Sequence, residues 1–405
     1  MKPALFLLLL LGTAYRLALN IVQYRSAGNP IPQNVADVYD AETYATWRRY
    51  SAKHNRLNIL STAVTFLVSA LLLCTNAYAA FASLFMEDTF PQLCAVVILE
   101  TLVDAVVSPI FGYYGTMVIE QKYGFNRSSL KTFIFDQIRN LLLEFGMSLL
   151  LAWLLALLHV ALGNWMILLF AVTVFCISLA ISFLYPIFSR MSNKFVPLEE
   201  GELKDRLMGL LTKHGYRVKA IEVMDASRRT SKLNAYFTGF GKMKTIVLYD
   251  NLINAMSTDE ICAVFAHELG HGLNRDVLKQ QIMNLGNMLL MAVVVWLAVR
   301  EPMLHTAFGF AAVNYGFAYL LLNIGLGLVQ PLTGMLTAAY SRHAEYRADR
   351  QAAEEGYGEA LITGLKKLAR ENFADLSPSR AIVVLEYSHP PLSARIAALE
   401  NAAEK

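Results

Sequence analysis

Long apolar runs alternate with short polar connections along most of this sequence. About 20 apolar residues in a helix cross the hydrocarbon core of a bilayer, and the chain reaches that length repeatedly. We therefore predict a mainly α-helical protein with a bundle of seven membrane-spanning helices. The predicted spans are Pro3–Val22, Leu57–Phe85, Pro91–Tyr113, Leu141–Leu162, Met166–Ser189, Gln281–Val299 and Ala307–Ala339.

The first and last spans depart from the simple pattern. Arg16 interrupts the first, whose Lys2 and following apolar run also fit a signal peptide, although we expect a retained span. The last covers 33 residues, more than one upright helix needs at about 1.5 Å per residue. Its end is expected to project from the membrane, with Pro331 as a site for a kink.

Basic residues predict the orientation of the bundle, because cytoplasmic loops tend to carry Lys and Arg. The loops after spans one and three are basic, whereas those after spans two and four contain no Lys or Arg. The basic positions are Arg25, Arg48, Arg49, Lys53, Arg56, Lys122, Arg127, Lys131 and Arg139. This pattern places the N-terminus outside, and the basic loops, the long segment after span five and the C-terminus in the cytoplasm.

Two segments have ordinary charge density and mixed patterning, which indicates soluble structure. The first combines a helix near 202–214 with strands near 218–223 and 245–249, and the second contains helices near 341–354 and 358–371. Four parts are therefore expected. They are the first five spans (1–189), a soluble part (190–280), spans six and seven (281–339) and a C-terminal soluble part (340–405).

Composition narrows the class of protein. Hydrophobic residues make up 56% of the 405 residues and charged residues only 17%, against roughly 25% in soluble domains. The net charge of +3 gives no reason to expect nucleic-acid binding. Four cysteines without a CxxC motif argue against a disulfide framework or a thiolate metal site.

The motif His267-Glu268-Leu-Gly-His271 predicts a metal centre. Ser257 and Glu260 have the spacing of a capping box, which starts a helix upstream. Histidines four residues apart then share one helical face and suit one zinc ion. Glu268 is expected to take the proton of a zinc-bound water as that water attacks a carbonyl.

A catalytic zinc needs a third protein ligand. We expect Glu345 to supply it from a helix near the C-terminus. Asp349 lies four residues later on the same face, where it can accept the free ring N–H of a ligating histidine. An ordinary surface carboxylate is the alternative for Glu345.

These motifs resemble those of the type I CAAX prenyl protease family of integral-membrane zinc metallopeptidases. The resemblance extends to Ile119–Arg127, Asn193–Leu198, Asn234-Ala-Tyr-Phe and Ser388-His-Pro-Pro-Leu, which occur in family order. It implies seven helices around a water-filled chamber, capped by a zincin-like α+β catalytic domain.

The resemblance also implies a role for each matching residue. His267, His271 and Glu345 would bind one Zn²⁺, and Glu268 would be the general base. Asn234, Ala235 and Tyr236 would lie where the substrate peptide binds. His389 and Arg395 would lie near the scissile carbonyl; without the family pattern, His389 is a turn histidine before two prolines. Glu100 and Asp104, one turn apart inside span three, would either line the chamber or form an interhelical contact.

These observations favour a membrane-embedded zinc endopeptidase over two alternatives. A quality-control metalloprotease for misfolded membrane proteins shares the zinc motif. A transporter or scaffold would show repeated or broken spans or a fourth protein ligand, and neither is evident. The expected partners are the bilayer and a peptide or protein substrate, with or without a prenyl group, and the chain is expected to be a monomer. The short loops favour a bacterial inner membrane over the endoplasmic reticulum.

Overall fold

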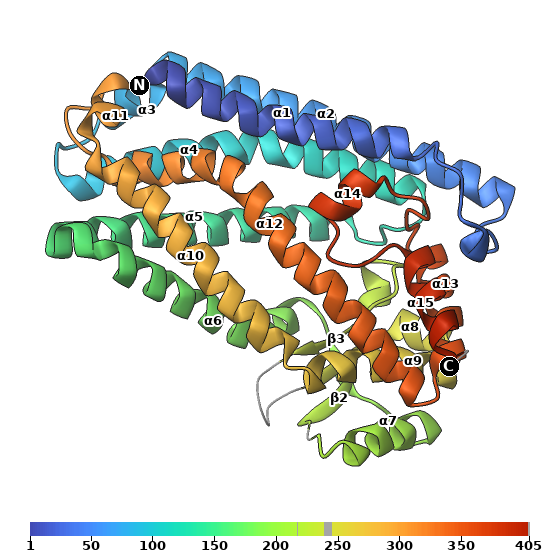
Figure 1. Cartoon of the computed structure of the whole chain (residues 1–405). Coiled ribbons are helices and arrows are strands. Elements are labelled where there is room, and N and C mark those ends of the chain that lie inside the picture. The colour runs from blue at the N-terminus through green and yellow to red at the C-terminus, as the bar shows by residue number, and fades with distance from the viewer. Residues whose placement is uncertain (217, 239–244, 404–405) are drawn as a thin grey trace.

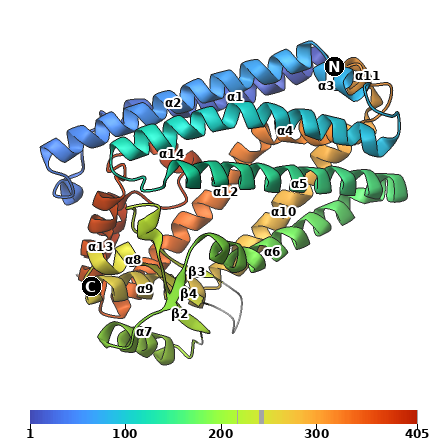
Figure 2. The same cartoon turned by 180° about the vertical axis from the view of Figure 1, so that it is seen from behind.

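The apolar runs form long helices because a helix satisfies its backbone hydrogen bonds internally, as the hydrocarbon core requires. The computed structural model describes residues 1–216, 218–238 and 245–403. Its long helices lie together, and a small sheet with shorter helices lies at one end of them (Figure 1). The view from behind shows the same division (Figure 2). The protein is mainly helical, as predicted.

Most helices outside the sheet region coincide with a predicted span. They are α1 (Lys2–Ser26), η1 (Gln33–Val35), α2 (Ala41–Cys74), α3 (Ala77–Ala82), α4 (Thr89–Tyr113), the π-helix η2 (Tyr114–Glu120), α5 (Leu130–Leu162), η3 (Gly163–Trp165), α6 (Met166–Ser192), α10 (Asp276–Arg300), α11 (Pro302–Ala307) and α12 (Tyr315–Glu354).

Six helical stretches among the described residues are long and apolar enough to cross a membrane. One of them, Leu130–Leu184, contains both α5 and most of α6. The chain reverses between these two helices at Gly163, which has a φ of 53°, a value that favours glycine. The count of seven spans stays a prediction.

Span two and span seven differ from the predicted ranges. The second helix stops at Cys74, because Asn76 adopts a left-handed conformation with a φ of 56° before the short α3 begins. The last long helix begins only at Tyr315, where the Asn314 side chain accepts a hydrogen bond from the Phe317 N–H at 2.9 Å. Local capping, which hydropathy does not report, sets both ends.

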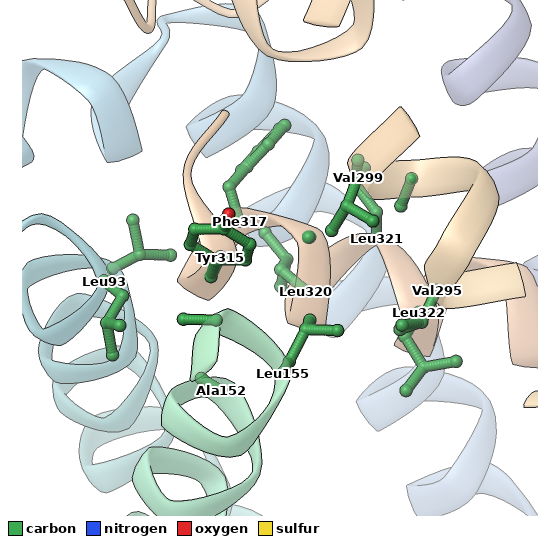
Figure 3. Close-up of a cluster of buried hydrophobic side chains, with 14 of the residues drawn as sticks. Leu93, Ala152, Leu155, Val295, Val299, Tyr315, Phe317, Leu320, Leu321 and Leu322 are labelled. Carbon is green, nitrogen blue, oxygen red and sulfur yellow. The ribbon is translucent and has the colours of Figure 1, made fainter. Parts of the chain in front are cut away.

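Helix α12 organises the membrane core. Figure 3 shows side chains of four helices meeting around its N-terminal half. The labelled residues are Leu93 of α4, Ala152 and Leu155 of α5, Val295 and Val299 of α10, and Tyr315, Phe317, Leu320, Leu321 and Leu322 of α12. Close packing rather than water exclusion holds helices together in lipid. Gly316 shows how close: a Cβ there would lie 2.5 Å from the Leu93 carbonyl oxygen.

The sheet region contains four described strands in the order β1-β2-β4-β3. Strands β2 and β4 are parallel, and β3 pairs antiparallel with β4 at one edge. The strands are β1 (Phe195–Pro197), β2 (Ala220–Met224), β3 (Ala235–Thr238) and β4 (Thr245–Tyr249). The strand predicted at 245–249 is confirmed, and the one predicted at 218–223 lies one to two residues later.

The remaining helices come from two distant parts of the sequence. The first group is α7 (Glu202–Lys213), η4 (Ala226–Arg228), α8 (Asp250–Ala255) and α9 (Thr258–Leu273), and the second is α13 (Gly358–Glu371), α14 (Arg380–Leu385) and α15 (Leu392–Ala403). Of these, α14 lies beside α1 and α12 rather than at the sheet (Figure 1). Helix α12 continues from the membrane core into the sheet region without interruption (Figure 1). Helices α10 and α12 cross the boundaries expected at 280/281 and 339/340, so the four-part division stays a prediction.

Candidate metal centre and active site

Helix α9 carries the paired histidines and begins as the sequence predicts. The Ser257 hydroxyl accepts the Glu260 N–H at 3.2 Å, and the Glu260 carboxylate accepts the Ser257 N–H at 2.7 Å. This capping box satisfies two of the backbone donors that a helix start leaves free. One turn apart on the buried face, His267 and His271 have ring centroids separated by 4.9 Å.

The third predicted ligand reaches these histidines from α12. The Nε2 of His271 lies 3.2 Å from Glu345 Oε1, and the Nε2 of His267 lies 3.5 Å from Glu345 Oε2. Each of the three residues offers one possible ligand atom, and these three atoms all lie within 4.8 Å of one another. The structure thus brings together His267, His271 and Glu345, which come from segments more than 70 residues apart.

The donor set fits a divalent transition metal. Two imidazoles and one carboxylate are typical of a catalytic zinc site with an open position. Glu345 is only 4% exposed, and its Oε2 accepts no hydrogen bond. A buried carboxylate oxygen without a hydrogen bond is costly. The Arg395 guanidinium lies 3.3 Å from this oxygen, and a cation between the three residues would add a direct contact to it.

A second carboxylate orients each histidine ring. Asp349 Oδ1 lies 2.8 Å from His267 Nδ1, as predicted, and Asp276 Oδ2 lies 3.1 Å from His271 Nδ1. Both Nδ1 atoms are engaged, so both Nε2 lone pairs are available to an ion.

The sequence analysis missed Asp276. It lies five residues after His271, beyond Arg275, whose left-handed φ of 55° ends α9 and starts α10. Its Oδ1 accepts hydrogen bonds from Tyr340 Oη at 2.8 Å and Arg347 Nη2 at 2.6 Å. No spacing rule links residues across such a turn, and the only sequence signal is an acid shortly after the motif.

The charges around His271 govern its protonation. Burial lowers the pKa of this imidazole, but hydrogen bonds from the ring to Glu345 and Asp276 outweigh burial and raise the pKa to about 9. A metal ion must therefore displace a proton from His271 at neutral pH.

Arg395 lies behind the ligands and is 8% exposed. Its Nε donates to Asp349 Oδ2 at 2.8 Å and its Nη2 to Asp349 Oδ1 at 2.6 Å. Its Nη1 lies 3.3 Å from Glu345 Oε2. This planar fork holds Asp349 and Glu345 in place; the action of Arg395 on a scissile carbonyl stays a prediction.

His389 lies on the exposed side of the centre. Its Nε2 is 3.4 Å from Glu345 Oε1, and its side chain is 63% exposed. The Ser388 hydroxyl lies 2.9 Å from His389 Nδ1. The residue is therefore next to the ligands, where its predicted contact with substrate stays open to test.

Strand β3 passes beside the predicted base. Ala235 and Tyr236 line a small cavity together with Glu268. Asn234 precedes the strand, and its carbonyl oxygen accepts the Tyr249 N–H at 3.1 Å. Among the described residues β3 pairs on one side only, with β4. A free strand edge next to a carboxylate can bind an extended peptide.

Glu100 and Asp104 line a separate cavity of about 310 Å³ inside the bundle. Tyr78 donates to Glu100 at 2.5 Å, and Ser108 donates to Asp104. Glu144 lines the same cavity. These carboxylates face a cavity within the protein, as intramembrane acids usually do.

Two family models match this chain. Residues 197–403 match Peptidase family M48, and residues 20–190 match the CAAX prenyl protease N-terminal model, described as five membrane helices. The chain belongs to peptidase family M48. Membership of this family identifies the M48 chain as a peptidase and implies a metal, and the match to the five-helix model places it in a membrane.

Individual relatives support the same assignment. The M48 chain is 31% identical to "CAAX prenyl protease 1 homolog" of Oryza sativa subsp. japonica over 96% of its own length and 94% of the relative. It is 31% identical to "CAAX prenyl protease 1" of Saccharomyces cerevisiae, over 79% of its own length and 74% of that relative. The crystal structure of S. mikatae Ste24p superposes with a TM-score of 0.91 at 25% identity, covering 98% of each chain.

These findings bear on localisation as well. The five-helix model and the apolar helices identify a multi-pass membrane protein. The relatives described above are eukaryotic, so they give no support to the expected bacterial inner membrane. The orientation of the helices stays a prediction.

Proposed function

We propose that this M48 chain is a zinc metalloendopeptidase that hydrolyses peptide bonds at the centre formed by α9 and α12. The observation that carries the proposal is the convergence of His267, His271 and Glu345 beside Glu268 and the edge of β3. A structural zinc usually has four protein ligands, whereas a set of three leaves room for the reacting groups.

The three ligands would hold one zinc ion. Zinc supplies a Lewis acid that polarises the scissile carbonyl and makes water nucleophilic at neutral pH. Glu268 takes the proton from the attacking water and delivers it to the leaving amine. Asp349 and Asp276 keep the two imidazoles in the tautomer whose Nε2 faces Glu345.

The remaining residues would bind the substrate. The extended peptide lies along the edge of β3 that faces away from β4, beside Asn234, Ala235 and Tyr236. His389 lies on the exposed side of the centre, where its ring stabilises negative charge on the scissile carbonyl oxygen. Arg395 adds positive charge from behind Glu345.

The names of the relatives suggest the substrate class. A prenylated or otherwise membrane-associated peptide fits an enzyme whose active site adjoins a bundle of apolar helices. The basic loops favour a catalytic region on the cytoplasmic side, in a chain that acts as a monomer.

Elemental analysis of the purified protein tests the metal assignment. The wild type should contain one zinc per chain, and Glu345→Ala should lose most of it, because two histidines alone form an incomplete site. Glu354→Ala is a matched control, since this exposed acid ends the same helix, and it should keep its zinc. Full zinc occupancy in Glu345→Ala would remove Glu345 from the ligand set.

A further inference from the structure

Arg16 occupies an unusual place for a charged residue. It lies in the middle of α1, a helix apolar enough to span a membrane. Helical spacing puts it on one face with Gly12 and Asn20. Gly12 faces α12 directly, since a Cβ there would lie 3.5 Å from the Gly327 carbonyl oxygen. Arg16 therefore lies on the side of α1 that is turned toward α12, one turn beyond the contact between the two helices, and its side chain is exposed.

Beyond that contact, α1 and α12 diverge (Figure 1) and a cavity of about 790 Å³ opens between them. Residues of α1, α2, α12 and the segment around α14 line it, including Arg16. Its other polar groups are mostly neutral amides and hydroxyls, such as Asn20, Gln23, Asn58 and Gln330. The cavity thus has a mixed polar and apolar lining, with a cation on one wall.

Arg16 has no carboxylate partner among the described residues. The one acid that lines the same cavity, Glu386, accepts a hydrogen bond from Tyr15 at 3.3 Å and forms no ion pair with Arg16. Charged residues inside spans are costly and normally pair with one another or mark a ligand pathway. A guanidinium without a partner in such a cavity is suited to a planar anion such as a carboxylate.

The same cavity comes close to the metal centre. Ser341 and Ser388 line it; Ser341 is one turn before Glu345, and Ser388 contacts His389. Along α12, Glu345 follows Gly327 by eighteen residues, or roughly 27 Å. Arg16 lies one helical turn closer to the metal centre than the contact of Gly12 with Gly327. A distance on the order of 20 Å therefore separates Arg16 from the predicted ligands. An extended peptide covers this distance in about six residues.

We propose that this cavity is a binding site for part of the peptide substrate remote from the scissile bond, and that Arg16 binds a carboxylate of that peptide. The carboxylate comes from an acidic side chain or from the C-terminus, about six residues from the bond that is cleaved. This inference rests on the proposed peptidase function and adds a determinant of substrate specificity to it.

A peptide scan tests this site with the full-length protein in detergent. One Glu is moved through a neutral fluorogenic peptide on both sides of the cleavage site, each time against Gln, and a second pair ends in a carboxylate or a carboxamide. For the wild type, one placement about six residues away should raise kcat/KM about tenfold through KM. Dependence on the side chain or on the C-terminus tells which source supplies the carboxylate, and either supports the proposal.

Variants of Arg16 then decide the assignment. Arg16→Gln should abolish the preference while keeping zinc and its activity on the neutral peptide, which shows that it is folded. Arg16→Glu should instead favour Lys at the same position. Arg25→Gln removes an equal charge from the end of the same helix, outside the cavity, and should keep the wild-type preference.

Some results would overturn this inference and leave the proposed peptidase function intact. The first is equal wild-type rates on all peptides, and the second is a preference that survives in Arg16→Gln. A uniform loss of activity in Arg16→Gln on every peptide also contradicts it, because a specificity residue acts selectively. If no peptide is hydrolysed at all, the proposed peptidase function fails, and this inference fails with it.

Discussion

Each histidine of the metal centre has its own carboxylate, but the two carboxylates come from different helices. Asp349 of α12 holds His267, and Asp276 of α10 holds His271. Asp276 is itself fixed by Tyr340 and Arg347 of α12. The orientation of His271 therefore depends on three helices at once.

Replacing Asp276 by Asn should weaken metal binding without changing a ligand. Loss of a carboxylate partner of a ligating histidine typically costs 10- to 100-fold in metal affinity, and a chelator competition assay measures the change. Asp259→Asn is the control, because this 66%-exposed acid near the start of α9 forms an ion pair with Arg206, away from the metal centre. Equal affinities of the wild type and Asp276→Asn would show that Asp276 does not support the centre.

The residues that lie together in the site were predictable where their spacing along one helix places them on the same face. His267 and His271 share a face by their separation of four, and so do Glu345 and Asp349. The pairing of His271 with Asp276 was not predictable, because it depends on the left-handed turn at Arg275. Arg16 was interpreted as an interruption of span one, and only the packing of α1 against α12 shows that it faces a cavity.

At the level of elements, the contact between α9 and α12 assembles the site. Gly270 lies inside the metal motif at a close contact between the two helices. A Cβ there would lie 2.9 Å from the Cα of Ala348 and 3.1 Å from the Cβ of Gln351. Real side chains do not approach a backbone atom this closely, so the missing Cβ allows Glu345 to reach the histidines.

Gly270→Ala should therefore separate the helices and lower both zinc occupancy and the melting temperature. We expect a loss of about 1–3 kcal/mol of stability, as for other overpacked sites. Gly209→Ala provides the control, because Gly209 is an exposed position of α7 where an added Cβ would have no other part of the protein within 4 Å, and alanine favours helix there. A zinc content in Gly270→Ala equal to that of Gly209→Ala would contradict the role of this contact.

The segment Ile119–Arg127 makes structural contacts that its sequence does not reveal. Tyr50 donates to Glu120 at 2.6 Å, and Lys232, just before β3, lies 3.4 Å from the same carboxylate. The Ser231 N–H donates to the Phe125 carbonyl at 3.2 Å. The π-helix η2 and its following loop thus anchor the segment that leads into β3, where we propose that the substrate binds.

Capping explains which element boundaries were predictable. The box at Ser257 is visible in the sequence and starts α9 as expected. The end of α2 at Cys74 depends on the left-handed Asn76, which lies in an otherwise apolar run. Hydropathy finds the existence of such helices but not where they stop.

Over the whole molecule, two soluble segments far apart in sequence meet on one continuous helix. Composition and patterning predicted both segments and the bundle, because lipid imposes strong limits on sequence. They could not predict that α12 would run unbroken from Gln330, which lines the cavity, to Glu345 at the metal centre. That continuity brings the interior of the bundle next to the metal centre.

This arrangement predicts that a lipid group on the substrate increases its hydrolysis. A farnesylated peptide should be cleaved with a kcat/KM at least about tenfold above that of the same peptide without farnesyl, since burial of only two CH₂ groups supplies this factor. The comparison is made below the concentration at which the lipid peptide forms micelles. Equal rates would favour an enzyme for unmodified or misfolded membrane proteins instead.

The central claim is that Glu268 performs proton transfer at a zinc centre formed by His267, His271 and Glu345. The most direct test measures zinc content and peptide hydrolysis of purified Glu268→Gln beside the wild type, with His267→Ala as the blank for contaminating peptidases. We predict one zinc per chain in Glu268→Gln and a kcat lowered by about 10²- to 10⁴-fold, whereas His267→Ala loses both metal and activity. Hydrolysis by the zinc-loaded Gln variant at the wild-type rate would contradict the account.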